Sequence, residues 1–220
     1  DQALQINTYG TLKVLHLAKA CRSLVSFVQV STAYVNSDRR GWVEERIYPM
    51  NRDPHMLLEE LSVLTVDEIE RRLPEILGAF PNTYTFTKNL TEHLLVEEAR
   101  NMPLCILRPT IIGGSWKEPY TGWVDSVAAA GAYYLMAGLG VVKTAIGNGN
   151  NIGDQVPVDT VTNAMLVAAA LLCSREELNV VHVGTSALNP VLWGKCAEVV
   201  QAYWRRHPPE KRVSRVNFNF

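Results

Sequence analysis

Three short β-rich runs, at residues 25–30, 104–107 and 180–183, are spread along the chain, and longer stretches with helical periodicity separate them. Strands buried on both faces of a sheet read as apolar runs of this kind, and helices that alternate with them are typical of a parallel sheet. The pattern therefore predicts an α/β domain in which the three runs are parallel strands of one doubly wound sheet. Two of them paired as an antiparallel hairpin would contradict this prediction.

Helices are predicted where apolar residues recur every three or four positions. They cover residues 2–22, 55–77 with a break at Pro74, 81–100, 160–173 and 190–205, and a further short strand is expected at 156–158. The uncharged run 126–142 is interpreted as a buried helix and turn, because it falls short of the ~20 apolar residues that span a bilayer. The long loop at 36–54 is expected to be functional, as long loops in compact domains usually are, and residues 112–122 are expected to form a loop rich in Gly, Trp and Pro.

The composition is that of a globular chain with balanced charge. About 47% of the 220 residues are hydrophobic, and 21 Lys and Arg side chains against 22 Asp and Glu side chains leave a net charge of −1. This balance argues against a nucleic-acid partner, which requires a basic face, and against a polybasic membrane module. Membrane association by other means is left open, as is the oligomeric state.

The cysteines indicate neither a metal centre nor a disulfide scaffold. They are Cys21, Cys105, Cys173 and Cys196, far apart, without a C-x-x-C pair and without histidines at ligand spacing. Each lies among apolar residues, so we expect buried free thiols. Free thiols fit a reducing compartment, and the protein is expected in the cytoplasm or on the cytosolic face of a membrane.

Polar residues directly follow two of the predicted strands. Ser31-Thr32 comes after 25–30, and Arg108-Pro109 comes after 104–107. Ligands of parallel α/β sheets bind at the carboxyl ends of the strands. These residues are therefore expected at a binding site.

Tyr84 and Lys88 are four residues apart on a predicted helix, so their side chains are expected on one face. An ammonium group beside a phenol favours the phenolate, which makes the pair a reasonable proton donor to a carbonyl oxygen. An ordinary surface Tyr–Lys pair would give the same spacing. The position of the helix, between a loop and a buried strand, favours the catalytic interpretation.

The sequence around these residues resembles the extended short-chain dehydrogenase/reductases, and more closely the reductase domain of fatty acyl-CoA reductases of the male sterility type. The matching segments are VSTAYVN at 30–36, PNTYTFTKNLTEHL at 81–94, ILRPTIIGGSWKEPYTGWVD at 106–125 and DQVPVDTVTNAM at 154–165. The resemblance covers nearly the whole chain. It implies a Rossmann-like sheet, NADPH as cofactor, and the reduction of long-chain fatty acyl-CoA to fatty aldehyde or fatty alcohol.

The resemblance also implies roles for individual residues. The catalytic residues would be Thr32, Tyr84 and Lys88, and the cofactor-binding residues would be Asn7, Ser31, Lys88, Pro109, Thr110 and Ile111. Asn7 could instead cap a helix, which is the alternative to a position beside the cofactor. Trp116 and Trp123 would wall an acyl pocket or pack a loop, and Asp159 is interpreted as a helix N-cap.

Members of the resembled family begin with a strand and a G-x-x-G-x-x-[GA] phosphate loop, which this sequence lacks. The turn GNGNNIG at 147–153 follows no convincing strand and opens no helix, so it does not replace that loop. Residues 1–220 are therefore interpreted as the C-terminal two-thirds of a reductase domain, incomplete at the N-terminus, with substrate-binding insertions around 36–80 and 112–155. We expect this chain alone to bind NADPH weakly or not at all.

The sequence leaves alternative functions open. One is a thioester reductase that acts on carrier-protein-bound acyl chains, or another extended reductase of the sugar or steroid type. A second is a non-catalytic interaction domain that keeps a reductase-like fold. The GSWKEPYTGW segment favours the acyl-CoA reductases, and the presence of Thr32, Tyr84 and Lys88 argues against a non-catalytic domain.

Overall fold

The computed structural model describes residues 2–142, 144, 146–174 and 177–210. It divides into two compact units. The first unit comprises Asp1–Arg108 and Met165–His182, and the second comprises Pro109–Ala164 and Val183–Phe220.

The first unit contains the predicted sheet. Its strands are β1 (Phe27–Val30), β2 (Leu104–Pro109) and β5 (Asn179–Val183), in the order β1-β2-β5. β1 and β2 are parallel, with Phe27 opposite Leu104 and Val30 opposite Leu107. The three runs therefore share one sheet, and the pair β1–β2 has the predicted parallel direction. The first strand begins two residues later than expected, because Val25 is 81% exposed and lies before the sheet.

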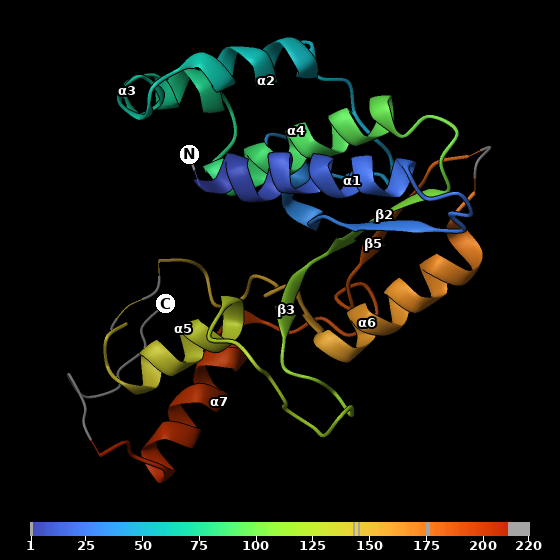
Figure 1. Cartoon of the computed structure of the whole chain (residues 1–220). Coiled ribbons are helices and arrows are strands. Elements are labelled where there is room, and N and C mark those ends of the chain that lie inside the picture. The colour runs from blue at the N-terminus through green and yellow to red at the C-terminus, as the bar shows by residue number, and fades with distance from the viewer. Residues whose placement is uncertain (1, 143, 145, 175–176, 211–220) are drawn as a thin grey trace. The chain divides into compact units, whose positions relative to one another are not determined.

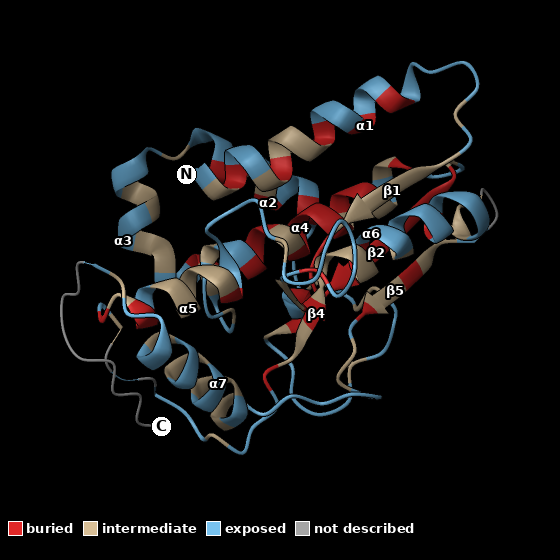
Figure 2. Cartoon of the chain, turned by 90° about the horizontal axis from the view of Figure 1, so that it is seen from below, coloured by how far each residue is buried: buried red, intermediate tan, exposed pale blue. Residues whose placement is uncertain are grey.

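Helices cover both faces of this sheet. The π-helical segment η1 (Leu4–Gly10), its continuation α1 (Thr11–Lys19), and α4 (Thr83–Glu98) lie along one face, while the π-helical turn η3 (Ala168–Leu172) contacts β1 from the other (Figure 1). Figure 2 shows the buried residues concentrated along α4 and β2. The core between helices and sheet consists mainly of Leu4, Leu12, Leu15, Leu90, Leu94, Leu95, Leu104 and Ile106. Burying these aliphatic side chains is the main force that holds the layers together.

Two further helices, α2 (Pro54–Val63) and α3 (Val66–Leu77), follow the first long loop. The predicted break at Pro74 was wrong, because α3 continues through that residue. The interruption lies at Leu64 and Thr65. Thr65 caps α3 in a capping box: its side chain accepts from the Glu68 backbone N–H, and the Glu68 carboxylate accepts from the Thr65 N–H. These bonds satisfy orphan donors of the first turn and so define a new helix start.

The second unit holds a parallel pair of short strands, β3 (Ile111–Gly113) and β4 (Gln155–Pro157). Its helices include α5 (Ala129–Gly138) and α7 (Trp193–Arg206), and α6 (Val158–Val167) begins directly after β4. α5 and α7 meet closely at Gly138, where an added Cβ would come within 2.0 Å of the Trp204 ring. Only glycine allows this approach. No helix in the described part of the chain is long and apolar enough to cross a bilayer.

The cysteines only partly match the prediction of buried thiols. Cys105 is buried in β2, where desolvation raises its thiol pKa to about 11. Cys173 and Cys196 are half-buried, whereas Cys21, at the end of α1, is exposed. Cys21 follows the last turn of the helix, beyond its core-facing stripe, so its apolar neighbours in sequence do not cover it. Among the described residues, no group of three or more His, Cys, Asp or Glu side chains could hold a metal ion.

Candidate active site

The helix α4 brings Tyr84 and Lys88 to the carboxyl end of β1. Asn82 starts the helix, since its side chain accepts from the Thr85 N–H at 2.9 Å. One turn separates Tyr84 from Lys88, and the Lys88 ammonium donates to the carbonyl of Val30, the last residue of β1, at 3.2 Å. The Tyr84 side chain is 47% exposed. The pair thus has the predicted spacing, with the lysine anchored and the tyrosine accessible.

The Lys88 ammonium is partly removed from water. Burial lowers its pKa below the ordinary value, and the negative charge of Glu92, one turn further along α4, partly opposes this effect. An ammonium group in such surroundings exerts a stronger field on its neighbours than one in bulk water.

Ser31 and Thr32 lie directly beyond β1, as predicted. Ser31 continues the strand pairing through its N–H, which donates to the Leu107 carbonyl at 2.7 Å. Thr32 then begins the short 3₁₀ turn η2 (Ala33–Asn36), and its Oγ1 accepts from the Tyr34 N–H at 3.3 Å. This contact uses an acceptor site and leaves the Thr32 O–H as a donor.

Asn7 is not a helix cap, because it lies inside η1. Its side-chain amide donates to Thr87 Oγ1 at 3.0 Å, and its carbonyl accepts from the hydroxyls of Thr11 at 2.8 Å and Thr91 at 3.1 Å. Asn7 therefore fastens η1 to α4 next to Lys88. The role of Asn7 beside a cofactor stays a prediction.

Sequence reasoning missed a buried ion pair next to these residues. Arg108 lies inside β2, not beyond its end as predicted, and it is fully buried. Its guanidinium donates to both Glu92 carboxylate oxygens, at 2.6 and 3.0 Å, and the Glu92 side chain is 2% exposed. Arg108 directly after the apolar run 104–107 was the available signal, because charged residues are rarely buried without a partner.

The predicted residues Pro109, Thr110 and Ile111 belong to the second unit. The Thr110 N–H donates to the Val183 carbonyl at 3.0 Å, and the Ile111 N–H donates to the Asp154 carbonyl at 3.0 Å. These bonds fix the backbone where β2 leads into β3. The Thr110 hydroxyl is buried and meets no hydrogen-bond partner among the described residues.

The interpretation of Asp159 as a helix N-cap was wrong. It lies in the first turn of α6, and its carboxylate chiefly accepts from the backbone N–H groups of Trp116, Lys117 and Glu118, at 2.9, 2.8 and 3.1 Å. These bonds hold the pKa of Asp159 near 2, well below its usual value. Trp116 itself is 64% exposed, and the Lys117 ammonium lies 4.3 Å from the centroid of its ring.

We expect Asp159→Asn to loosen the 116–118 segment, because an amide offers one acceptor oxygen in place of a carboxylate. Since the folded-state pKa is depressed, the stabilisation by Asp159 is present above pH ~4 and is lost as pH falls toward about 2. Wild-type protein should therefore lose thermal stability across this window more steeply than the variant. Scanning calorimetry at several pH values measures the difference, with Asp125→Asn, an exposed acid in the same loop region, as control.

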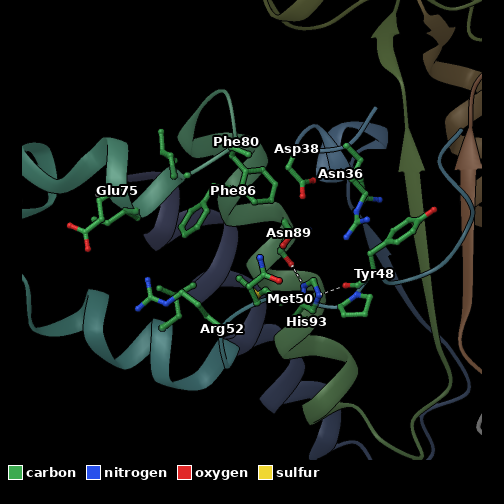
Figure 3. Close-up of a pocket in the computed structure, with 18 residues that line it drawn as sticks. Asn36, Asp38, Tyr48, Met50, Arg52, Glu75, Phe80, Phe86, Asn89 and His93 are labelled. Atoms are coloured by element: carbon green, nitrogen blue, oxygen red, sulfur yellow. Dashed lines mark hydrogen bonds between the residues drawn. The ribbon is translucent and has the colours of Figure 1, made fainter. Parts of the chain in front are cut away.

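A cavity of about 240 Å³ lies in the first unit, between the 36–53 loop, the end of α3 and α4 (Figure 3). Phe86, Asn89 and His93 line it from α4. The His93 ring nitrogens Nδ1 and Nε2 lie 2.9 Å from the Asn89 carbonyl oxygen and 2.8 Å from the Tyr48 carbonyl oxygen, and each carbonyl accepts where the facing nitrogen carries a proton. With 3.6 residues per turn, these residues project from the side of α4 opposite Tyr84 and Lys88. This cavity is therefore separate from the candidate catalytic face.

Comparison with solved structures defines the fold class. The chain is similar to UDP-glucuronic acid 4-epimerase from Bacillus cereus, solved in complex with NAD, with a TM-score of 0.58 and 18% identity over 97% of this chain and 55% of that one. The fold is that of the extended short-chain dehydrogenase/reductases, and the chain forms part of one such domain. This likeness shows the fold alone.

Comparison of sequences gives the family. Residues 1–165 match the family model described as "Male sterility protein", and the chain belongs to this family. It is 36% identical to fatty acyl-CoA reductase 1 of Xenopus laevis and 33% identical to that of Homo sapiens, in each case over 99% of this chain. The chain spans 42% of the length of these two relatives.

Proposed function

We propose that the protein is an oxidoreductase that reduces long-chain fatty acyl-CoA with NADPH. Family membership and the names of the relatives support this activity. The observation that carries the proposal is the common face of Tyr84 and Lys88, with the half-buried ammonium bound to the end of β1 and the phenol accessible. Three details of this proposal rest on the sequence resemblance. They are the preference for NADPH over NADH, the long acyl chain of the substrate, and an aldehyde or alcohol as product.

The residues present fit a nicotinamide cofactor. Ser31 Oγ in the first unit and Thr110 Oγ1 in the second are both buried without a hydrogen-bond partner in the described parts of the chain. An unpaired buried hydroxyl is costly, and a bound polar ligand would satisfy it. Lys88 has three N–H donors, of which one binds Val30. In the first unit, Asn7, Ser31 and Lys88 would contact the cofactor, which would supply hydride for the reduction. The turn at 109–111, in the second unit, is assigned to the cofactor by the sequence resemblance alone.

The chain's own groups would act on the thioester oxygen. Tyr84 donates its proton to this oxygen as negative charge develops there, and the Thr32 O–H donates a second hydrogen bond to it. Lys88 would favour proton release from Tyr84 by its positive charge, and it would also help to hold the cofactor. Two donors on a developing oxyanion stabilise the transition state more than the bound substrate, which is what accelerates a reaction.

Substitutions of Lys88 and of Thr32 should differ in their effects on NADPH affinity. Lys88→Ala is expected to lower both the turnover number and the affinity for NADPH, since one side chain serves both purposes. Thr32→Ala is expected to lower turnover by about 10- to 1000-fold, the upper value being that of an oxyanion-hole donor, with NADPH affinity retained. Steady-state kinetics together with NADPH titration separate the two effects. Equal effects of both substitutions on NADPH binding would contradict these roles.

The proposed activity can be tested directly. Full-length protein is incubated with NADPH or NADH and with acyl-CoA thioesters from octanoyl to stearoyl, and gas chromatography identifies aldehyde and alcohol. We expect NADPH-dependent product from the long-chain thioesters. Turnover of carrier-protein-bound acyl chains without turnover of acyl-CoA would instead favour a thioester reductase. No reduction of either substrate, with NADPH bound, would refute the proposal.

A further inference from the structure

The cavity of the first unit, between the 36–53 loop and α4, combines apolar walls with one unsatisfied polar group (Figure 3). Asn36 lines this cavity from η2 and is only 5% exposed. Within the described residues, its Nδ2 is the one buried polar side-chain atom of the lining that lacks a hydrogen-bond partner. A donor buried in this way is costly unless a ligand or a water molecule accepts from it.

The polar side chains that α4 contributes to the cavity are already engaged with the backbone. The Asn89 amide donates to the Val35 carbonyl at 3.0 Å. The two ring nitrogens of His93 face the carbonyls of Asn89 and Tyr48. These contacts attach η2 and the loop to α4, so the walls are fixed without a ligand. Asn36 is left as the buried donor that a ligand can use.

Much of the remaining lining is apolar. It includes Met50, Leu57, Ile76, Leu77, Phe80 and Phe86. The rings of Phe80 and Phe86 lie next to each other in Figure 3 and meet edge to face, with their centroids 5.8 Å apart. An apolar cavity of ~150 Å³ holds benzene, so the cavity of about 240 Å³ has room for on the order of ten non-hydrogen atoms.

The charged side chains of the lining favour an uncharged ligand. They are Asp38, Arg39, Arg52 and Glu75, two of each sign, and all four are exposed. Arg52 already pairs with Glu60, and Glu75 pairs with Arg72. A carboxylate that accepted from Asn36 Nδ2 would therefore be buried without a buried cation beside it. The cost of burying that charge exceeds what one neutral N–H donor returns.

We propose that this cavity is a binding site for a small uncharged carbonyl compound, with an apolar body against Phe80 and Phe86 and a carbonyl oxygen that accepts from Asn36 Nδ2. A carbonyl oxygen is favoured over a hydroxyl group because it brings no donor of its own that would need an acceptor. The site lies on the side of α4 away from Tyr84 and Lys88. This inference therefore goes beyond the proposed function and does not depend on it.

Calorimetric titration of the full-length protein with acetophenone and with isopropenylbenzene tests the hydrogen bond. The two probes have the same shape, but a methylene group replaces the carbonyl oxygen in the second. Both should bind saturably. Asn36→Leu should weaken acetophenone by about fivefold or more relative to isopropenylbenzene, because the variant has no donor for the oxygen. Comparing the ratio of the two affinities between proteins cancels the different hydrophobicities of the probes and the altered shape of the site.

The matched control is Asn150→Leu, at an exposed asparagine of the second unit, which should leave the ratio unchanged. Circular dichroism confirms that each variant is folded, and Asn36→Ala takes the place of Asn36→Leu if the latter is not. Phe80→Leu should weaken both probes alike, by ~2- to 10-fold, because it removes an aromatic contact and keeps the donor.

Two measurements on the wild type complete the test. Benzoate, which has the same number of non-hydrogen atoms as acetophenone but carries a charge at neutral pH, should bind more weakly than acetophenone. A crystal structure of the acetophenone complex should place the carbonyl oxygen at hydrogen-bond distance from Asn36 Nδ2. The proposal is overturned if neither probe binds saturably, if the affinity ratio is unchanged in the folded Asn36 variant, if benzoate binds more tightly, or if acetophenone lies elsewhere.

Discussion

Replacing Tyr84 by Phe is expected to lower the turnover of the reductase reaction by about 10²–10⁴-fold, the range of general acid catalysis. The affinity for NADPH should stay nearly unchanged. The phenol proton moves only as charge develops on the substrate oxygen, so its loss affects the transition state and not the ground state. Tyr84 is also 47% exposed and lies in the first turn of α4, so removing its hydroxyl leaves no cavity in the core.

The measurement combines steady-state kinetics with NADPH titration on the full-length protein. Tyr203→Phe is a suitable control, because Tyr203 is an exposed tyrosine on α7 that stacks on His207 and has no part in the proposed chemistry. We expect wild-type kinetics for it. A Tyr84→Phe enzyme that retains most of its turnover would remove Tyr84 from the mechanism.

The parts of the fold that follow local rules were predictable from the sequence. Helix α4 combines an Asn cap, an apolar stripe and no internal glycine or proline, and the structure starts it within two residues of the predicted position. The strand β2 was likewise evident as a run of apolar residues that is buried throughout. In both cases the local signal and the tertiary environment favour the same structure.

Two predictions, those for Pro74 and Asp159, were wrong because a local sequence signal competed with other interactions. A proline normally breaks a helix, but the capping box at Thr65 starts α3 well before Pro74, and the helix continues through the proline to Leu77, with Ile76 buried. Asp159 has the residue type and place of an N-cap, yet three backbone N–H groups from a loop more than forty residues away along the chain bind it instead. Such partners cannot be read from local sequence.

In the candidate site, too, some features follow from the local sequence and others depend on distant residues. The i, i+4 spacing of Tyr84 and Lys88 and the position of Thr32 beyond β1 follow from helix and strand geometry, so they could be predicted. The hydrogen-bond acceptor of Lys88 could not, because it comes from another element. Val30 is distant in sequence, and the Glu92 charge that acts on Lys88 is itself held by Arg108 from β2. The electrostatics of the lysine therefore depend on the buried ion pair.

This dependence predicts an effect of Glu92 on the reaction. The Glu92 charge raises the pKa of Lys88, against the larger lowering effect of burial. In a folded Glu92→Gln variant, the Lys88 ammonium should lose its proton at a lower pH than in the wild type. The alkaline fall of the turnover number should therefore move to lower pH, which a pH–rate profile measures.

Glu92→Leu should lower the free energy of unfolding by about 3–5 kcal/mol, the range for breaking a buried ion pair. The Glu92 carboxylate neutralises Arg108, whose side chain is 1% exposed, and the substitution leaves that charge buried without an acceptor. Arg108 Nη1 already lacks a hydrogen-bond partner within the described residues, so the guanidinium has little to replace the lost bonds.

The double variant Glu92→Leu with Arg108→Met should recover most of this loss, because it removes both charges and fills the space with apolar atoms. Urea unfolding of the wild type, both single variants and the double variant gives the coupling energy of the pair. Lys195→Ala serves as control: Lys195 pairs with Glu198 at 3.0 Å with both side chains about two-thirds exposed, and its loss should cost ~1 kcal/mol or less. Additive losses in the double variant would mean that Glu92 stabilises the fold by some means other than its bond to Arg108.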